Sequence, residues 1–398
     1  MKTLRILQIC PQLPFPPDTG GRIGIYEVTR HLALRGHRIT LAALVKEFRE
    51  APGLERYCEV KQIGPIDTRS AKYGLVANLF STMPYTISKY QSAQASRELM
   101  DLLQHQEFDL VYLDHLHTAY YGAAIRKFHR LPIVLREHNV ETRIMERLYQ
   151  NAANLAIRLW AYIQYRRVRS YESRMCELFD RCLMTSYVDE DLIRRINPRV
   201  RTAVIPVGVD TAYFQPQEVQ EDPYLMLFVG PMDWLPNVDG ISWFCKEVLP
   251  LIAARVPEAK VLIVGRNPPR IRNLASERVI VKGYVEDIRP YMARAGVVIV
   301  PLRIGSGVRV KILHAFAMGK AVVATSVGCE GIDAKHGEHL YVADTREAFA
   351  EQVAGLMSSQ KERSRLGLAA RGLVESKYSW SRIAEKLEEV LLDVVEEF

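Results

Sequence analysis

Residues 297–325 read VVIVPLRIGSGVRVKILHAFAMGKAVVAT and decide the fold class. A run of branched apolar residues predicts a buried strand, and a Gly-Ser-Gly turn then leads into a helix that begins near Val308. Gly319 is placed to end this helix, because glycine readily adopts the backbone conformation of a helix C-cap. A second apolar run follows. The order strand, turn, helix and strand is the repeating unit of a parallel α/β sheet.

The same order of elements recurs along both halves of the chain, which predicts two doubly wound, Rossmann-like α/β domains. Apolar runs predict strands at 4–10, 38–45, 110–113, 133–135, 181–185, 225–229, 261–264, 279–281, 297–301 and 321–324. A Pro/Gly turn within 203–216 indicates a linker, so the domain boundary is predicted between residues 205 and 206. Because ligands bind at the carboxyl ends of parallel strands, the site is expected in a cleft between the domains.

The composition is that of an ordinary globular protein, and it restricts the partners. The 398 residues are 48% hydrophobic and 25% charged, with a net charge of +7 that favours anionic partners. Nucleic acid is not expected, because the chain has no zinc-finger spacing and no RNA-binding aromatic signature. The longest apolar run after the first strand, 295–302, is far shorter than the roughly 18 to 20 residues that span a bilayer.

The cysteines and the first residues predict a cytoplasmic location. The six cysteines form no Cys-x-x-Cys pair, which is typical of reduced thiols. The apolar run 4–10 contains Arg5 and is followed by prolines rather than by a small-residue cleavage site, so a signal peptide is not predicted.

The turn at 305–307 and the helix after it have the features of a phosphate-binding site. Gly305 and Gly307 would let the backbone approach an anion, and the start of the helix offers unpaired N–H groups. Arg309 and Lys311 add positive charge, and charge-assisted hydrogen bonds of this kind contribute about 1.5 to 3 kcal/mol each. The alternative is an ordinary glycine turn with solvated basic residues. It is not a P-loop, because no Ser or Thr follows the Gly-Lys pair at 319–320.

Six further stretches, together with 297–325, resemble the retaining glycosyltransferases of family 4, which have the GT-B fold. The closest likeness is to sugar transferases of bacterial exopolysaccharide clusters. Any one stretch is weakly specific, but their order and spacing cover nearly the whole chain. The stretches are PQLPFPPDTGGRIGIYEVTRHLALRGHRIT at 11–40, REHNVET at 136–142, VGPMDWLPNVDGISWF at 229–244, VGRNPP at 264–269, GYVEDIRPYMARA at 283–295 and VGCEGI at 327–332.

The resemblance implies that the second domain (206–379) holds a nucleotide-sugar donor. The first domain (1–205, with a C-terminal helix of 380–398 that crosses back onto it) would then hold the acceptor. The implied catalytic residues are His138, which contacts the transferred sugar, and Arg309 and Lys311, which neutralise the departing diphosphate. The residues implied in donor binding are Gly20, Gly21, Arg266, Gly283, Tyr284, Val285, Gly305, Ser306, Gly307, Val308 and His314.

Three departures from the family pattern affect the donor site. Two glutamates seven residues apart are usual, and Ser306 and His314 occupy the matching positions. A neutral histidine offers only one acceptor nitrogen to a ribose, so donor binding is expected to be weaker or differently arranged. The family also has an Arg and a Lys after the second domain's first strand, whereas 231–237 contains no cation. Arg309 and Lys311, helped by Arg266 or Arg303, would have to supply this charge.

The function that the resemblance implies is transfer of a hexose from a nucleotide diphosphate sugar to a glycan or lipid-linked acceptor, with retention of configuration. Cations and N–H groups that meet the charge of the leaving diphosphate make a metal unnecessary. No Asp-x-Asp with apolar flanks is present, and the pair Asp189 and Asp191 is interpreted as part of a solvated helix face. No cofactor is therefore predicted. The alternatives are a nucleotide-sugar epimerase on the same fold and a catalytically impaired nucleotide- or partner-binding protein.

Three other features allow two interpretations each. Asp114, His115 and His117 follow a strand and are either a metal cluster or acceptor-site groups. The segment 73–90 is either a flap facing the membrane or the acceptor, or part of the core. A basic helix with apolar residues either makes a peripheral contact with anionic lipid or is a solvated helix packed on its own domain. Its arginines are Arg158, Arg166, Arg167, Arg169 and Arg174.

Overall fold

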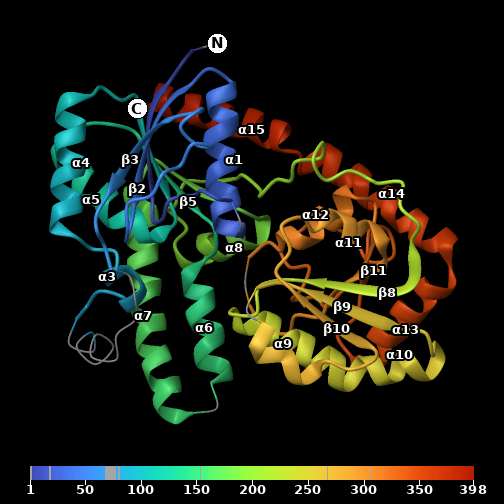
Figure 1. Ribbon diagram of the computed structural model, residues 1–398. Helices are drawn as coiled ribbons and strands as arrows, with labels where there is room; N and C mark the ends of the chain where they lie inside the picture. Colours follow the sequence, from blue (N-terminus) through green and yellow to red (C-terminus); the bar gives the residue numbers. More distant parts are fainter. Residues whose placement is uncertain are drawn as a thin grey trace. The chain divides into compact units, whose positions relative to one another are not determined.

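The computed structural model describes residues 2–17, 19–67, 78, 81–152, 154–266, 268–305 and 307–398. The chain forms two compact units (Figure 1). Unit 1 comprises Met1–Pro206 and Ile383–Phe398, and unit 2 comprises Val207–Arg382. The division falls one residue after the boundary that the linker pattern predicts.

Unit 1 is a seven-stranded parallel sheet with the order β3-β2-β1-β4-β5-β6-β7. Its elements are β1 Arg5–Cys10, α1 Gly20–Leu34, β2 Arg38–Leu44, β3 Glu59–Ile63, α3 Tyr85–Ser88, α4 Ala93–His105, β4 Leu110–Asp114, η1 Leu116–Thr118, α5 Ala119–Phe128, β5 Ile133–Glu137, α6 Glu141–Asn151, α7 Leu155–Leu178, β6 Arg181–Met184, α8 Tyr187–Ile196 and β7 Thr202–Val204. The order changes direction between β1 and β4, which is the switch point of a doubly wound sheet.

The strands of unit 1 are apolar on both sides because helices cover both faces of the sheet. Leu7 and Ile9 of β1 pack in the cluster that α4 and α5 contribute to, whereas Cys10 packs in the cluster of Ile25 from α1. Alternate residues of a strand point to opposite faces, so one short apolar run supplies both cores.

Unit 2 is a six-stranded parallel sheet with the order β10-β9-β8-β11-β12-β13, and its switch point lies between β8 and β11. Its elements are β8 Asp222–Val229, α9 Leu235–Trp243, the π-helical turn η2 Phe244–Val248, α10 Leu249–Arg255, β9 Lys260–Val264, η3 Pro268–Leu274, β10 Val279–Gly283, α11 Arg289–Arg294, β11 Ala295–Val300, α12 Val310–Ala317, β12 Ala321–Ala324, β13 Tyr341–Val342, α13 Arg346–Ser358 and α14 Gln360–Lys377. Two parallel Rossmann-like sheets confirm the predicted fold class.

The last helix, α15 Trp380–Glu397, begins within unit 2, but from Ile383 onward it belongs to unit 1. Its Leu387 and Leu391 are fully buried, and the carboxylate of Glu388 is buried between two residues that follow α1. Arg35 Nε donates to Glu388 Oε2 at 2.6 Å. His37 Nε2 lies 3.0 Å from Glu388 Oε1 and donates to it, because His37 Nδ1 accepts from the backbone N–H of Leu4. The return of this helix to the first domain is therefore confirmed.

Replacement of Glu388 with alanine is expected to destabilise unit 1 by about 3 kcal/mol, because it leaves a half-buried arginine and a buried histidine without their carboxylate. Burial raises the pKa of Glu388, but the hydrogen bonds and charges of Arg35 and His37 outweigh burial and lower it. The contribution of Glu388 is therefore present above the ordinary carboxyl pKa and is lost as pH falls through the lowered one. Chemical denaturation at pH 7 measures the loss.

The exposed neighbour Glu389 supplies the matched control for this experiment. Glu389→Ala should leave the denaturation midpoint nearly unchanged. Equal midpoints for the two variants would show that the buried carboxylate does not anchor the helix.

No helix in the described ranges is both long enough and apolar enough to cross a bilayer.

Candidate functional site

The carboxyl ends of three neighbouring strands of unit 2 meet in a patch of closely packed backbone. Gly230, Gly265 and Gly283 follow or end the neighbouring strands β8, β9 and β10. The N–H of Gly265 donates to the carbonyl of Gly283 at 2.9 Å, and a Cβ on Gly265 would collide with the carbonyl of Gly230. Only glycine fits at 265, so these strand ends present backbone rather than side chains.

The turn after β11 brings the guanidinium of Arg309 close to the backbone of Gly305. Gly305 and Gly307 have φ values of 120° and 82°, which favour glycine. A Cβ on Gly305 would lie 2.7 Å from Nη2 of Arg309, so glycine at 305 makes room for the guanidinium. Arg309 is buried, and its guanidinium lies 5.2 Å from the ring of Trp234.

The helix after this turn starts later than the sequence predicts. Helix α12 begins at Val310, with Arg309 as its N-cap residue, rather than near Val308. Val308 therefore belongs to the turn, because the two positive-φ glycines delay the helical conformation. Ser306 lies outside the described residues.

Lys311 places a half-buried ammonium at the switch point of unit 2. Its Nζ donates to Oδ1 of Asn237 at 3.0 Å and lies 4.5 Å from the ring centre of Phe228. Asn237 is itself fixed, because its Nδ2 donates to the carbonyl of Pro231 at 2.8 Å. A Cβ on Gly230 would lie 2.8 Å from the ammonium. Lys311 thus supplies a cation beside the loop 231–237, which contains none of its own.

The pKa of Lys311 is lowered from its ordinary value to about 7, because burial disfavours the ammonium and Arg309 repels it. A bound diphosphate would favour the charged form. Affinity for a nucleotide sugar is therefore expected to be highest below pH 7 and to fall by up to about tenfold per pH unit above it. Calorimetry with an intact nucleotide sugar tests this, because its diphosphate is a diester and does not titrate near neutrality.

Lys311→Arg is the control for the pH experiment, because the guanidinium stays charged throughout. Its affinity should vary little between pH 6 and pH 8. A pH dependence equal to that of the unaltered protein would assign the effect to another group.

Arg266, Tyr284 and Val285 lie at the same sheet edge, whereas Gly20 and Gly21, which are also implied in donor binding, begin α1 of unit 1. Arg266 follows β9, and its carbonyl accepts from the N–H of Met232. Tyr284 is exposed and Val285 half-buried after β10. The guanidinium of Arg303 forms an ion pair with Asp239 at 2.6 Å, so any charge that it lends to Arg309 and Lys311 is shared with that carboxylate.

His314, at the position where the family has its second glutamate, is in contact with an aromatic ring. Its ring stacks on Phe214 with centroids 3.9 Å apart and planes 10° from parallel. Burial lowers the pKa of His314 to about 4, so the ring is neutral at pH 7.

Unit 1 also has a cluster of polar residues, which lies at the switch point of its sheet. Gln8 of β1 donates from Nε2 to Oδ2 of Asp114 at 2.7 Å, and Thr29 of α1 donates to Gln8 Oε1 at 2.8 Å. His138, which follows β5, places its Nε2 3.0 Å from Oδ1 of Asp114. Burial raises the pKa of Asp114, while the charge of Arg136 and the hydrogen bond from Gln8 oppose this shift. When Asp114 is ionised, Nε2 of His138 carries the proton, and Nδ1 keeps its lone pair. Burial, and then Arg136, lower the pKa of His138, so it is neutral.

A second histidine is stacked on the first. The rings of His115 and His138 lie 3.7 Å apart and 11° from parallel. His115 has a φ of 65°, a strained value for a residue with a side chain, and its buried Nε2 has no hydrogen-bond partner among the described residues. This Nε2 lies 3.6 Å from a Cβ built on Gly21, which with Gly20 begins α1. Gly21, His115 and His138 therefore lie together.

The described residues contain no group of three His, Cys, Asp or Glu that could hold a metal ion. Asp114, His115 and His117 follow one strand, but Asp114 is occupied by Gln8 and His138. The interpretation of Asp189 as solvated is wrong, because Asp189 is buried: its N–H donates to Oγ of Ser186, the N-cap residue of α8, and the Ser186 hydroxyl donates to its carboxylate. Asp191 is exposed, as the interpretation holds.

The segment 73–90 is described only in part. Residues 73–77, 79 and 80 lie outside the described residues. Tyr85 is buried, and Met83 and Tyr90 pack against the core of unit 1, as the core interpretation expects.

Two models of glycosyltransferase families match this chain, one in each half. Residues 19–213 match the family described as Glycosyltransferase Family 4, and residues 223–359 match the family described as Glycosyl transferases group 1. The chain belongs to glycosyltransferase family 4. The predicted resemblance is therefore confirmed.

Two relatives of this family 4 chain differ in how much of it they match. An uncharacterized 44.6 kDa protein of the cps region of Klebsiella pneumoniae is 19% identical over 95% of this chain and 97% of its own length. A GDP-mannose-dependent monoacylated alpha-(1-6)-phosphatidylinositol monomannoside mannosyltransferase of Corynebacterium glutamicum is 29% identical. That match covers 47% of this chain and 55% of the relative.

Solved structures support the GT-B fold of the family 4 chain. A sucrose-phosphate synthase of Thermosynechococcus elongatus superposes with a TM-score of 0.77 at 19% identity, over 99% of this chain and 100% of its own. HepE of Anabaena, in complex with UDP, has a TM-score of 0.69 at 14% identity, over 98% and 100% of the two chains. At these identities the likeness shows the fold alone.

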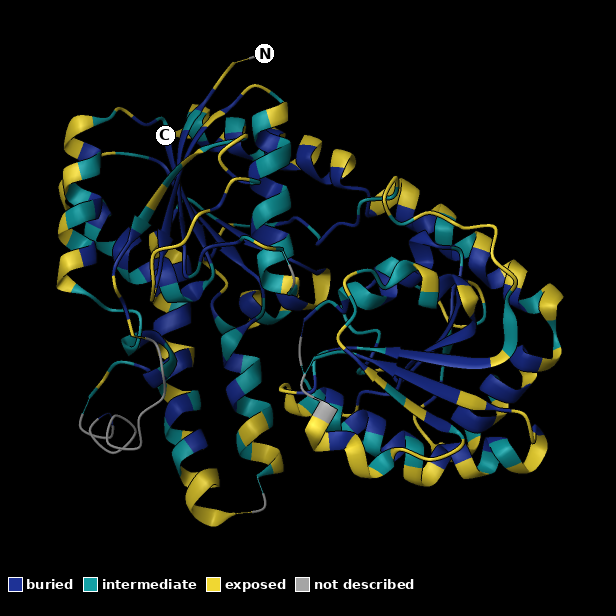
Figure 2. Ribbon diagram, viewed as in Figure 1, coloured by how far each residue is buried: buried dark blue, intermediate teal, exposed yellow. Residues whose placement is uncertain are grey.

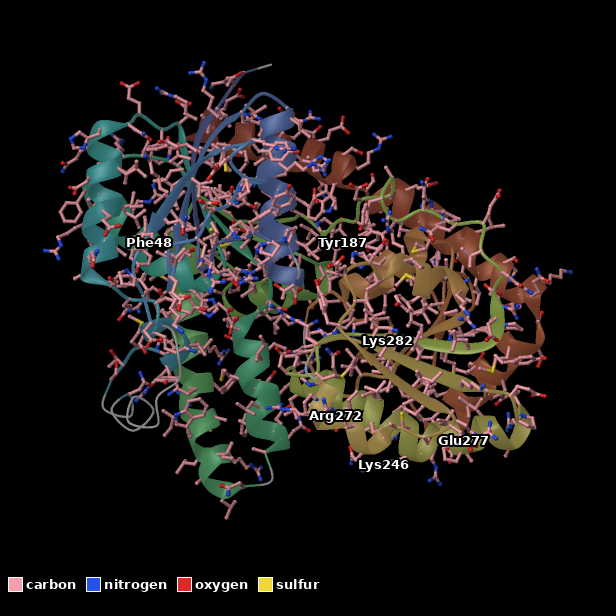
Figure 3. The ribbon with its side chains drawn as sticks, viewed as in Figure 1. Phe48, Tyr187, Lys246, Arg272, Glu277 and Lys282 are labelled. Carbon is pink, nitrogen blue, oxygen red and sulfur yellow. The ribbon has the colours of Figure 1, made fainter. Side chains whose placement is uncertain are left out.

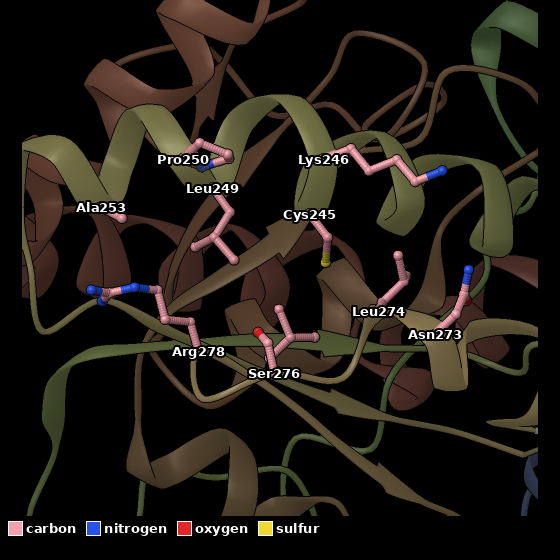
Figure 4. Close-up of a pocket in the computed structure, with 10 residues that line it drawn as sticks. Cys245, Lys246, Leu249, Pro250, Ala253, Asn273, Leu274, Ser276 and Arg278 are labelled. Carbon is pink, nitrogen blue, oxygen red and sulfur yellow. The ribbon is translucent and has the colours of Figure 1, made fainter.

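The family 4 chain also has a surface hollow of about 460 Å³ in unit 2, which is not part of the candidate site (Figure 4). Leu249 and Ala253 of α10 line one side, and Ser276, Arg278 and Val279 line the other. Val279 is the first residue of β10, so the hollow lies at the amino end of that strand. Ligands of open parallel sheets bind at the carboxyl ends, where the glycines, Arg309 and Lys311 are found.

Sequence reasoning missed the residues that hold the candidate side chains in place. They are Gln8, Thr29, Phe214, Trp234 and Asn237. Gln8 could have been found, because a glutamine within the apolar run RILQIC must either pair inside the core or serve the site.

Proposed function

We propose that the protein transfers a hexose from a nucleotide diphosphate sugar to a glycan or lipid-linked acceptor during the synthesis of a cell-surface polysaccharide. Transfer would retain the anomeric configuration, need no metal ion and take place in the cytoplasm. The observation that carries the proposal is the Lys311 ammonium, held by Asn237 at the switch point of unit 2 and 3.0 Å from its amide oxygen.

The comparisons support this choice of substrate class. HepE is described with UDP and with UDP-glucose, and the Corynebacterium relative is named as GDP-mannose-dependent. These donors share a diphosphate between a nucleoside and a sugar. The name of the Klebsiella relative refers to a cps region, which favours a role in surface polysaccharide synthesis.

In the proposed reaction, unit 2 binds the donor and stabilises its leaving group. Negative charge accumulates on the diphosphate as the sugar–phosphate bond breaks. Arg309 and Lys311 would meet this charge, and the turn at Gly305 and Gly307 lets the backbone approach it. Arg266, Gly283, Tyr284 and Val285 would border the nucleoside. Since the two cations are already in place, the transition state gains their attraction without reorganisation.

Unit 1 would bind the acceptor and position the transferred sugar. Gly20 and Gly21 keep the start of α1 free of side chains. The neutral His138, oriented by Asp114, offers the lone pair of Nδ1 to a sugar hydroxyl. A hydrogen bond to a fixed lone pair orients the sugar without adding charge to the acceptor side.

Binding of the nucleotide diphosphate is the first test of the proposal. Calorimetry of the purified protein with UDP, GDP, ADP and dTDP, with and without Mg²⁺, should show one preferred nucleotide and no need for the ion. Turnover of the preferred nucleotide sugar is then followed by NMR of the product anomer. Turnover without acceptor would favour an epimerase, binding without any turnover would favour an impaired protein, and a strict metal requirement would contradict the metal-free mechanism.

Position 314 tests whether the missing glutamate weakens the donor site. His314→Glu should raise nucleotide affinity by about 10-fold if the carboxylate accepts hydrogen bonds from the ribose, as charge-assisted hydrogen bonds do elsewhere. Burial of a carboxylate beside Phe214 opposes the gain. His314→Gln is the neutral control. A folded His314→Glu variant with lower affinity than His314→Gln would place the ribose elsewhere.

A further inference from the structure

Helices α6 and α7 of unit 1 form an antiparallel hairpin. The last turn of α6 and the first turns of α7, which form one end of this hairpin, are exposed. Figure 2 shows this end of both helices mostly in the colour of exposed residues. Four large aliphatic side chains there are solvent-accessible: Leu148 is 38% exposed, Leu155 78%, Ile157 50% and Leu159 62%. We call these four residues the hairpin end.

Such a concentration of exposed aliphatic side chains differs from the rest of unit 1. Elsewhere the exposed large apolar residues are more scattered, as at Phe48 after β2 and Tyr187 at the start of α8 (Figure 3). Scattered exposed apolar residues are normal on a globular surface, whereas a cluster indicates a binding surface.

The aliphatic residues are followed along the helices by aromatic ones. Tyr162 is 40% exposed, and its ring lies 5.5 Å from that of Tyr149 on α6. Tyr165 stacks on Tyr149 at 5.9 Å. Trp160 is half-buried beside them in the sequence. Tyrosine and tryptophan are enriched where a protein passes from lipid hydrocarbon to water.

Arginines follow the aromatic residues. Leu155, Leu159, Tyr162 and Arg166 are spaced by four, three and four residues, so they form one exposed stripe of α7. At 1.5 Å per residue, Arg166 lies about 16 Å along the helix from Leu155. From residue 147 to residue 171 the sequence contains five arginines and no Asp or Glu. Arg147 and Arg158 lie beside the aliphatic residues, whereas Arg166, Arg167 and Arg169 follow the aromatic ones. Three of the five arginines therefore lie beyond the aromatic residues, and the other two flank the aliphatic end.

We infer that the hairpin end docks on an anionic lipid membrane, with its aliphatic side chains in the interface and its arginines at the phosphate groups. An aliphatic end without acidic residues fits hydrocarbon below a layer of negative charge. The stripe ends at a depth suited to lying in one leaflet and is too short to cross a bilayer. This surface uses none of the candidate site residues, so it goes beyond the proposed transfer reaction.

The two halves of the basic helix differ in how they are packed. The half of α7 that contains Val168, Met175 and Cys176 packs on the core of unit 1. The half that contains Leu155, Ile157 and Leu159 is exposed. The interpretation as a helix packed on its own domain holds for the second half, and the exposed first half is the part that we infer to contact lipid.

Sedimentation with vesicles tests the inference. The full chain should bind vesicles of phosphatidylcholine mixed with phosphatidylglycerol much more tightly than vesicles of phosphatidylcholine alone. The triple variant Leu155→Ser, Ile157→Ser and Leu159→Ser should bind at least about 10-fold more weakly. The double variant Arg166→Gln and Arg169→Gln should bind more weakly, by about 5-fold for each arginine removed. High salt should also weaken binding of the unaltered protein, because it screens the attraction between arginines and phosphates.

The control variants are Leu34→Ser and Phe128→Ser, which remove exposed apolar side chains from other helices of unit 1. They should bind vesicles like the unaltered protein, and all variants should keep the same affinity for the preferred nucleotide. Absence of vesicle binding, or equal binding by the triple variant, would overturn the inference while leaving the transfer reaction standing. Self-association that only the triple variant loses would overturn it in favour of a second copy of the chain.

Discussion

Replacement of Lys311 with alanine is expected to weaken binding of the nucleotide diphosphate by about 10- to 150-fold, the range that 1.5 to 3 kcal/mol per charge-assisted hydrogen bond corresponds to. Transfer should fall at least as far, because the charge on the leaving group is largest in the transition state. The expected loss is large because 231–237 contains no cation that could replace the ammonium. Calorimetry with the nucleotide measures binding, and initial rates measure transfer.

The control for Lys311→Ala is Lys246→Ala, which removes an exposed lysine that lines the hollow at the amino end of β10 (labelled in Figure 3). It should bind nucleotide normally. A folded Lys311→Ala variant with unchanged affinity would remove Lys311 from the phosphate site. Thermal unfolding of both variants tests whether the difference in affinity comes from a loss of stability. Little loss is expected, because the Asn237 amide still donates to the carbonyl of Pro231.

Replacement of His138 with alanine is expected to lower the transfer rate by about 100-fold or more and to leave binding of the nucleotide diphosphate unchanged. The histidine belongs to unit 1, whereas the cations proposed to hold the diphosphate belong to unit 2. Loss of a group that fixes the reacting sugar misplaces it, and small misplacements cost rates of this order. Initial rates at saturating donor separate this effect from a change in affinity.

Asp114→Asn tests the orientation of His138 by a second route. The amide can donate as well as accept, so His138 can adopt the other tautomer and lose the lone pair of Nδ1. Its rate should therefore fall in the same direction, with normal nucleotide binding. His105→Ala, at the exposed end of α4, is the control. Normal transfer by a folded His138→Ala variant would rule out a role of this side chain in the reaction.

Much of the fold could be predicted because its central strands are short apolar runs buried on both faces. The strands that the pattern missed lie at the sheet edges. β3 reads EVKQI and alternates between polar and apolar residues, β7 has three residues and β13 has two. An edge strand is paired on one side only and needs less apolar surface, so its sequence carries a weaker signal.

Only the parts of the candidate site that lie within one continuous segment could be predicted from the sequence. The glycines of the turn and the positions of Arg309 and Lys311 follow from one stretch of sequence. The contact of Lys311 with Asn237 joins residues 74 positions apart, and that of Gln8 with Asp114 joins residues 106 apart. Burial and pairing are not visible in the sequence pattern: Arg303 forms an ion pair with Asp239, and burial lowers the pKa of Lys311 to about 7.

The discontinuity of unit 1 has a consequence for the order in which the chain can fold during synthesis. Residues 383–398 leave the ribosome only after all of unit 2, although Leu387 and Leu391 are part of the buried interior of unit 1. Unit 2 can complete its core while unit 1 still lacks its last helix. Until then the apolar surface that α15 covers is open to solvent, and a nascent chain that stalls at this stage would be a substrate for chaperones.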